Sequence, residues 1–169
     1  MNKHDTIRSM KLFLFDMEGT LYLGDRLYPF TISLLRRIKE TGGRYLFMTN
    51  NSSRGVEDNI RKLRKLGILS TREDFITSAQ ATAYYLRQNH PGKQLYVCGT
   101  VSLKRELSWA GFEVAEDPEE AECIVMGFDT ELTFRKLRDV CKLLLTREIP
   151  YIATNPDYVC PTEFGSVPD

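Results

Sequence analysis

A short apolar run that ends in a carboxylate, Lys11 to Thr20 (KLFLFDMEGT), constrains the fold of this chain more than any other stretch. The run KLFLF is too short for a buried helix and is rich in aromatic residues, which is typical of a buried strand. Asp16 therefore stands at the carboxyl end of that strand, where open α/β sheets bind their ligands. By position alone, a residue that merely caps a turn explains Asp16 equally well.

Strands and helices alternate through the rest of the first half of the chain. Helical spacing of apolar residues and turn residues such as Gly24, Gly42 and Gly67 delimit the elements. The predicted elements are a hairpin over 21–28, a helix from 31 to 41, a strand over 44–48, a helix over 56–66 and a strand over 75–77. This alternation predicts a parallel sheet, so the ends of neighbouring strands should place Asp16 and Thr49-Asn50 on one rim.

A second α/β unit is predicted after Ser78, where the same order of elements begins again. Its predicted elements are helices over 79–89, from 101 to 110 and over 133–146, and strands over 94–98, 112–114, 123–126 and 151–153. Phe134, Leu137 and Leu144 are expected on one face of the last helix, together with Val140 and Cys141. The stretch 158–169 is expected to be loop throughout, and its abrupt end suggests a fragment of a longer protein.

Composition excludes several classes of protein. Lys plus Arg and Asp plus Glu number 23 each, so no excess of positive charge favours nucleic acid or an anionic membrane. No apolar run is long enough to span a bilayer, and the N-terminus lacks the apolar core of a signal peptide, which favours a cytoplasmic protein. The four cysteines form no CxxC pair, so we expect buried free thiols in a reducing compartment instead of a zinc site.

The residues around the first strand end suit phosphoryl transfer. Asp16 can attack phosphorus and form an acyl-phosphate, while Glu18 can protonate the leaving oxygen and then activate water. A threonine hydroxyl and backbone amides at the next strand end can hold the phosphoryl oxygens. Because a carboxylate and a phosphate dianion repel each other, a divalent cation is needed, and Mg²⁺ suits oxygen ligands.

With these features the chain resembles the haloacid dehalogenase superfamily, and within it the NagD-like, 4-nitrophenylphosphatase-type phosphatases. The resemblance rests on FDMEGTLYLGD (15–25), FMTNNSS (47–53), ITSAQATAYYL (76–86), YVCGT (96–100), IVMGFD (124–129) and IATNPD (152–157). It implies an α/β fold in which residues 1–78 form the N-terminal part of a Rossmann-like core. Residues 79–169 would form an incomplete α/β cap domain.

The resemblance also implies roles for individual residues. Asp16 and Glu18 would be catalytic and would bind Mg²⁺, and Thr49, Asn50 and Asn51 would bind phosphate. Two further residues, Asn155 and Asp157, would lie in a loop that selects the substrate. The substrate would be a small phosphorylated metabolite, with neither nucleic acid nor membrane as a partner, and the cap is a candidate surface for a homodimer.

Two departures keep a second function open. The family places Asp where this chain has Glu18, and the extra methylene displaces the carboxyl by roughly 1 Å, which can lower the rate about 10²-fold. The family's lysine and further acids follow the cap, and Lys136 and Lys142 of the cap are expected to be solvated. This chain alone is therefore expected to turn over little substrate. The alternative is an impaired or truncated relative that binds or dimerises, whereas a dinucleotide-binding dehydrogenase is disfavoured because no GxGxxG follows a strand.

Overall fold

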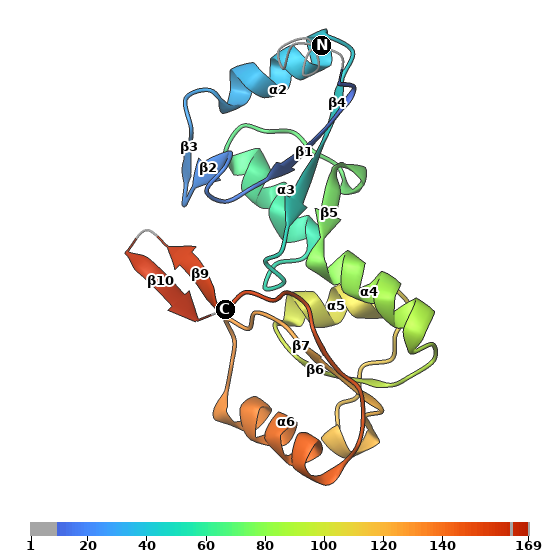
Figure 1. Cartoon of the computed structure of the whole chain (residues 1–169). Coiled ribbons are helices and arrows are strands. Elements are labelled where there is room, and N and C mark those ends of the chain that lie inside the picture. The colour runs from blue at the N-terminus through green and yellow to red at the C-terminus, as the bar shows by residue number, and fades with distance from the viewer. Residues whose placement is uncertain (1–9, 163, 169) are drawn as a thin grey trace, which may run out of the picture. The chain divides into compact units, whose positions relative to one another are not determined.

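The computed structural model describes residues 10–162 and 164–168, and the chain divides into two compact units (Figure 1). The first consists of the chain up to Thr49 and of Ile60–Ile76, and the second of Asn50–Asn59 and the chain from Thr77 onward. The division lies near the predicted boundary after residue 78, except that residues 50–59 group with the second unit. The identification of the two units as part of a core and a cap stays a prediction.

The first unit contains a three-stranded sheet in the order β1-β4-β5. Strands β1 and β4 are parallel, and Phe15 lies beside Phe47 in their register. The elements are β1 (Leu12–Asp16), β2 (Tyr22–Leu23), β3 (Arg26–Leu27), α2 (Thr31–Glu40), β4 (Arg44–Thr49), α3 (Val56–Lys65), the 3-10 turn η1 (Arg72–Asp74) and β5 (Phe75–Thr77). The predicted strand, hairpin and helix order of this half is confirmed.

The two faces of this sheet differ in cover. Aromatic rings fill one face, where Phe47 lies 5.3 Å from the ring of Tyr45 and 5.5 Å from that of Phe75. The side chains on the opposite face remain exposed in the part of the chain that the structure describes. They are Leu12 and Leu14 at 51% each, Met48 at 38% and Ile76 at 39%.

The second unit contains a parallel sheet in the order β6-β7-β8. Thr77, Thr100 and Thr133 cap its three helices, each accepting a hydrogen bond from a backbone N–H in the first turn. The elements are α4 (Ser78–Asn89), β6 (Leu95–Cys98), α5 (Val101–Trp109), the 3-10 turn η2 (Pro118–Glu120), β7 (Cys123–Met126), α6 (Phe134–Thr146), β8 (Tyr151–Ala153), β9 (Val159–Thr162) and β10 (Gly165–Pro168).

Helices cover both faces of this sheet, because the strand residues alternate between two apolar clusters. One cluster joins α4 and α5 to the face that carries Leu95, Val97 and Val125. The other joins α6 to the face that carries Tyr96 and Ile124. Strands β6 and β7 are therefore buried on both sides, whereas Tyr151 and Ala153 of β8 remain exposed. Burial on both sides explains why β6 and β7 read as continuous apolar runs in the sequence.

Two predictions about the second half are wrong. Residues 112–114 form no strand, and only an isolated bridge joins Val114 to Leu95. The described residues of 158–169 are not a plain loop, because β9 and β10 pair as an antiparallel hairpin. The structure adds that most of the apolar face predicted for α6 is uncovered. Phe134 is 81% exposed, and Leu137 and Leu144 are also exposed, because the sheet contacts only the flank with Val140 and Leu143.

The thiols are all free, as predicted, but only two of them are buried. Cys98 and Cys123 lie in the apolar clusters, whereas Cys141 is exposed and Cys160 is half-buried. Among the residues that the structure describes, none of the helices has the length and apolar character needed to cross a bilayer.

Candidate active site

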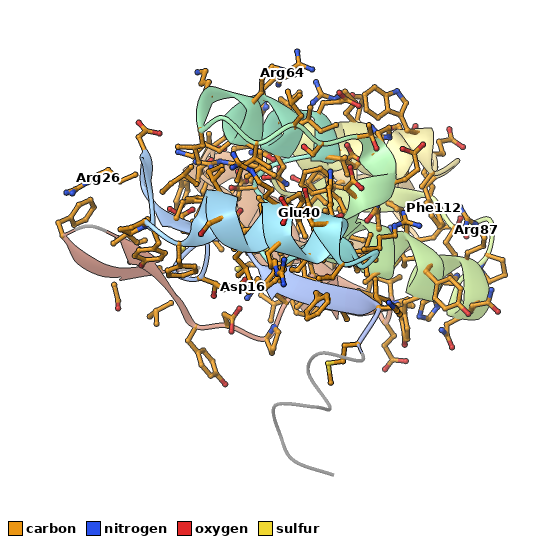
Figure 2. The ribbon with its side chains drawn as sticks, turned by 90° about the horizontal axis from the view of Figure 1, so that it is seen from above. Asp16, Arg26, Glu40, Arg64, Arg87 and Phe112 are labelled. Atoms are coloured by element: carbon orange, nitrogen blue, oxygen red, sulfur yellow. The ribbon has the colours of Figure 1, made fainter. Side chains whose placement is uncertain are left out.

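Asp16 occupies the carboxyl end of β1, with its side chain exposed (Figure 2). The strand pairing sets Asp16 beside Met48, so Thr49, the last residue of β4, lies one position further along the same rim. The hydroxyl of Thr20 donates a hydrogen bond to Asp16 Oδ2 over 3.1 Å. The predicted placement of Asp16 and Thr49 on one rim is confirmed, while their roles stay predictions.

Glu18 is held two residues beyond Asp16 by the β2–β3 hairpin. Its backbone forms a bridge with Tyr22, and its Oε1 accepts a hydrogen bond from the Gly24 amide at 3.3 Å. Gly24 has a φ of +55°, a left-handed conformation that a glycine adopts without strain at this turn. The hairpin therefore fixes where the longer Glu18 side chain points.

Oxygen atoms at this strand end suit Mg²⁺, which uses one or two carboxylates and completes its shell with water and substrate phosphate. Asp16 is exposed and Glu18 half-buried, so both carboxylates are within reach of solvent. In the described part of the chain, no group of three or more His, Cys, Asp or Glu side chains could hold a metal ion. The donors present fit a sparsely ligated Mg²⁺ and do not fit a metal caged by protein alone.

Asn50 and Asn51 belong to the second unit. The side-chain Nδ2 group of Asn50 donates a hydrogen bond to Asp157 Oδ2. The backbone carbonyl oxygen of Asn50 accepts one from the Ser78 hydroxyl at 2.9 Å. The Asn51 Oδ1 atom accepts hydrogen bonds from the backbone N–H and the hydroxyl of Ser53, at 3.0 Å and 2.6 Å. Asn51 thus shapes the turn after β4, and the phosphate-binding role of both residues stays a prediction.

Asn155 and Asp157 lie in the loop that follows β8. Asn155 Oδ1 is 3.0 Å from the Thr154 hydroxyl oxygen, and Asn155 Nδ2 donates towards Asp157 Oδ2 over 3.5 Å. The structure therefore brings together three of the residues singled out from the sequence, Asn50, Asn155 and Asp157, although about a hundred positions separate the first from the others.

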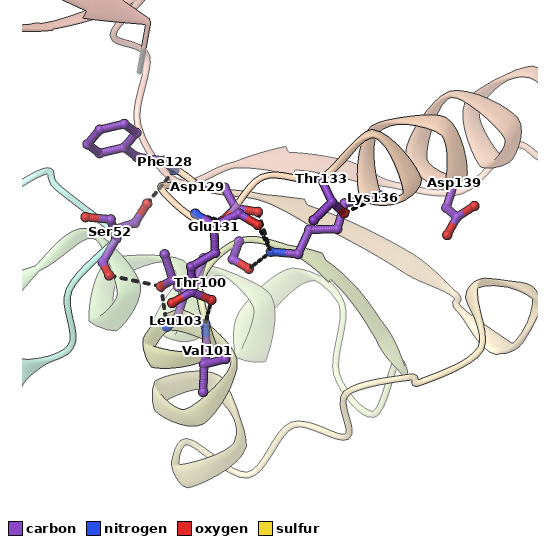
Figure 3. Close-up of polar contacts among 12 residues, drawn as sticks. Ser52, Thr100, Val101, Leu103, Phe128, Asp129, Glu131, Thr133, Lys136 and Asp139 are labelled. Carbon is purple, nitrogen blue, oxygen red and sulfur yellow. Dashed lines mark hydrogen bonds and ion pairs between the residues drawn. The ribbon is translucent and has the colours of Figure 1, made fainter.

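Lys136 corrects another prediction, because it is not solvated. Its Nζ atom lies 2.7 Å from Asp129 Oδ2 and donates to the carbonyl oxygens of Gly99 and Glu131 (Figure 3). The side chains of Lys136 and Asp129 are only 18% and 2% exposed. This ion pair fixes the loop between β7 and α6. Lys142 is solvated as predicted, at 61% exposure beside Glu119.

Cys98 lies at the end of β6, next to this ion pair. Burial raises the pKa of the Cys98 thiol, and the nearby Asp129 carboxylate raises it further. A thiol nucleophile needs a lowered pKa. Cys98 is therefore a packing residue, in agreement with the sequence.

Sequence reasoning missed Ser52 and Thr154, which join the loops after β4 and β8. Their hydroxyl oxygens lie 2.9 Å apart. The Phe128 N–H donates to Ser52 Oγ at 2.8 Å (Figure 3). The one signal in the sequence is the repeat of MTN at 48–50 as ATN at 153–155. Three residues are too few to identify such a contact.

The known proteins that are similar to this chain include several phosphatases. An acid sugar phosphatase of Staphylococcus aureus is 32% identical over 162 residues, which is 96% of this chain and 62% of that protein. A 4-nitrophenylphosphatase structure from Thermotoga maritima matches with a TM-score of 0.87 and 37% identity over 96% of this chain and 61% of the other. A structure of a Mycobacterium tuberculosis glycerol phosphate phosphatase in complex with magnesium matches with a TM-score of 0.84 and 28% identity. The match covers 94% of this chain and 48% of the other.

The chain thus spans about three fifths of the length of the acid sugar phosphatase and of the 4-nitrophenylphosphatase. A family model described as haloacid dehalogenase-like hydrolase matches residues 13–113, which include β1 with Asp16 and β4 with Thr49. On this match, the chain belongs to the haloacid dehalogenase-like hydrolase family.

Proposed function

We propose that the protein carrying this chain is a Mg²⁺-dependent phosphomonoesterase that acts on a small phosphorylated metabolite through an aspartyl-phosphate at Asp16. The observation that carries the proposal is the exposed Asp16 carboxylate at the end of β1, one position from the rim residue Thr49 and hydrogen-bonded by Thr20. The names of the relatives, which include sugar and glycerol phosphate phosphatases, support this substrate class.

In the first step of the proposed reaction, an Asp16 carboxylate oxygen forms a bond to phosphorus as the bond to the leaving oxygen breaks. Glu18 gives a proton to that leaving oxygen, so a neutral alcohol departs. The Thr20 hydroxyl orients the attacking carboxylate through its bond to Oδ2. The hydroxyl of Thr49 and the amides of Asn50 and Asn51 would bind the phosphoryl oxygens.

In the second step a water molecule attacks phosphorus and gives its proton to Glu18. The bond from phosphorus to Asp16 breaks, which frees inorganic phosphate and restores the carboxylate. Mg²⁺, held by the Asp16 carboxylate and the backbone carbonyl of Glu18, would offset the repulsion between carboxylate and phosphate. The hydrogen bond from Gly24 keeps the Glu18 carboxylate at the hairpin between the two proton transfers.

The proposal is tested by hydrolysis of 4-nitrophenyl phosphate, with Mg²⁺ and after its removal by a chelator. We expect hydrolysis only with Mg²⁺ and its complete loss in Asp16→Asn, which keeps the shape of the side chain but removes the nucleophile. Hydrolysis that survives Asp16→Asn would refute the nucleophile. Absence of hydrolysis in the unaltered protein would favour the alternative, a binding role.

A cytoplasmic location and a homodimer formed through the second unit complete the proposal. The 23 basic residues are balanced by 23 acidic ones, so the chain has no excess positive charge to attract nucleic acid or an anionic membrane. This balance supports a small molecule as the partner.

A further inference from the structure

Two loops of the second unit are joined by a chain of polar contacts that the backbone from Asn50 to Ser52 completes. It is here called the polar ring and consists of Asn50, Ser52, Thr154, Asn155 and Asp157. Ser52 and Thr154 form one bridge between the loops, and Asn50 and Asp157 form the other. Asn155 connects the two bridges, because its amide contacts the hydroxyl of Thr154 and the carboxylate of Asp157.

Only one direction of hydrogen-bond donation satisfies both hydroxyl groups of the polar ring. Thr154 Oγ1 lies 2.9 Å from Ser52 Oγ and 3.0 Å from Asn155 Oδ1, but its hydroxyl has a single hydrogen. Asn155 Oδ1 can only accept, so Thr154 donates to it and Ser52 donates to Thr154. Ser52 Oγ in turn accepts from the Phe128 N–H. Successive donors of this kind polarise and strengthen one another.

The surroundings of Ser52 leave little freedom for a different arrangement. Ser52 is 1% exposed, and a Cβ on Gly127 would come within 2.8 Å of its Oγ. A side chain at position 127 would therefore displace Ser52. On the other side, the Thr100 hydroxyl donates to the Ser53 carbonyl at 2.9 Å and pins the same segment.

The order of the ring fixes the Asn155 amide. With Oδ1 bound to the Thr154 hydroxyl, Nδ2 faces the Asp157 carboxylate. If Thr154 could not donate, only the 3.5 Å contact between Nδ2 and Asp157 Oδ2 would hold the amide, and its orientation would no longer be fixed. The hydroxyls of Ser52 and Thr154 therefore decide which polar atoms the exposed loop with Asp157 presents.

We propose that Ser52 and Thr154 are positioning residues, which orient Asn155 and Asp157 to receive the hydroxyl groups of the substrate's alcohol part. This inference rests on the proposed phosphatase function. A carboxylate accepts hydrogen bonds from hydroxyls, so a phosphate ester of a polyol gains from the ordered ring, whereas 4-nitrophenyl phosphate has no hydroxyl to offer. Ser52 and Thr154 act through the other residues and do not touch substrate themselves.

The test compares Thr154→Val, which keeps the shape but removes the hydroxyl, with Thr154→Ser, which keeps the hydroxyl. Ser52→Ala removes the other hydroxyl of the bridge. Two exposed residues serve as controls for the same chemical changes, Thr146→Val on α6 and Ser108→Ala on α5.

The first measurement is nuclear magnetic resonance without substrate, which reports on the ring whether or not the protein is an enzyme. Ser52→Ala should speed hydrogen exchange at the Phe128 amide about tenfold, because that donor loses its acceptor. Thr154→Val should shift the side-chain amide signals of Asn155, and Thr154→Ser should restore them. Unchanged signals in Thr154→Val would show that the ring is absent, which overturns the inference.

The second measurement is the ratio of kcat/KM for glycerol phosphate to kcat/KM for 4-nitrophenyl phosphate. Thr154→Val and Ser52→Ala should lower this ratio about tenfold, mainly through KM, as expected when polar groups of the site lose their alignment. Thr154→Ser and both controls should keep it within about twofold.

The outcomes separate the inference from the proposed function. A changed resonance spectrum with an unchanged ratio would mean that the ring serves the fold alone, which overturns the positioning role while the phosphatase function stands. If the unaltered protein hydrolyses neither ester, the proposed function fails and the positioning role fails with it, whatever the resonance spectrum shows.

Discussion

The buried ion pair between Lys136 and Asp129 gives the sharpest prediction about stability. Replacing Lys136 by Met keeps most of the apolar stem but removes the charge. Asp129 is 2% exposed and would remain as a carboxylate without that cation. Breaking a buried pair in this way destabilises a protein by about 3–5 kcal/mol, because the remaining charge cannot regain its hydration.

The same helix provides a matched control. Lys142 pairs with Glu119 at 2.5 Å, but the two side chains are 61% and 55% exposed. Water and salt screen an exposed pair, so Lys142→Met should have little effect on the free energy of unfolding. The two variants therefore differ in burial and not in chemistry.

Urea unfolding followed by Trp109, the single tryptophan, measures the second unit, which contains it. For a slope of about 2 kcal/mol/M, Lys136→Met should lower the midpoint by about 1.5 M or more. Adding Asp129→Asn should recover part of that loss, because it removes the stranded charge. If Lys136→Met and Lys142→Met shift the midpoint equally, the burial argument is refuted.

Four further predictions concern individual side chains. A thiol reagent followed by mass spectrometry should label the exposed Cys141 in the native protein and leave the buried Cys98 and Cys123 unlabelled. Burial also raises the pKa of both buried thiols, that of Cys123 to about 11. Equal labelling of the three cysteines would contradict the burial of Cys98 and Cys123. Burial raises the pKa of the Cys123 thiol to about 11, and unfolding returns it to 9.0, so between these values the unfolded chain loses the thiol proton first. The free energy of unfolding should therefore fall as pH rises from 9 towards 11, and a flat stability profile there would contradict this. Apart from the homodimer proposed for the second unit, the exposed apolar sheet face of the first unit should make this chain self-associate. Leu14→Lys on that face should reduce the association in sedimentation, and an unchanged profile would show that this face is not the contact. Glu18→Asp should raise turnover of 4-nitrophenyl phosphate, and a fall would mean that the hairpin has adapted the site to the longer side chain.

Local patterns were sufficient for most of the fold. The apolar runs that became β1, β4, β6, β7 and β8 are short and bounded by turn residues, and each helix showed its spacing and its stop. The hairpin β9–β10 was missed because Pro161 and Pro168 interrupt its strands, and proline is unfavourable inside a sheet. The exposure of Phe134, Leu137 and Leu144 on α6 could not be predicted, because apolar spacing identifies a helix without indicating how wide a strip its neighbours cover.

The candidate site was predictable only where it follows from strand order. Asp16 and Thr49 end neighbouring parallel strands, so their shared rim follows from the alternation of elements. The bridge from Ser52 to Thr154 joins residues 102 positions apart, and no local pattern carries that information. Lys136 was assigned to solvent for a different reason: its partner Asp129 is only seven positions away, but it lies in a loop of irregular conformation that no periodic pattern describes.

The central claim, that Asp16 is the nucleophile, is tested most directly by trapping the phosphorylated enzyme. The protein is mixed with 4-nitrophenyl phosphate and Mg²⁺, quenched in acid, digested and examined by mass spectrometry. We predict that the peptide with Asp16 carries one phosphoryl group and that Asp16→Asn carries none. A phosphoryl group on another residue, or turnover by Asp16→Asn at the rate of the unaltered protein, would contradict the claim.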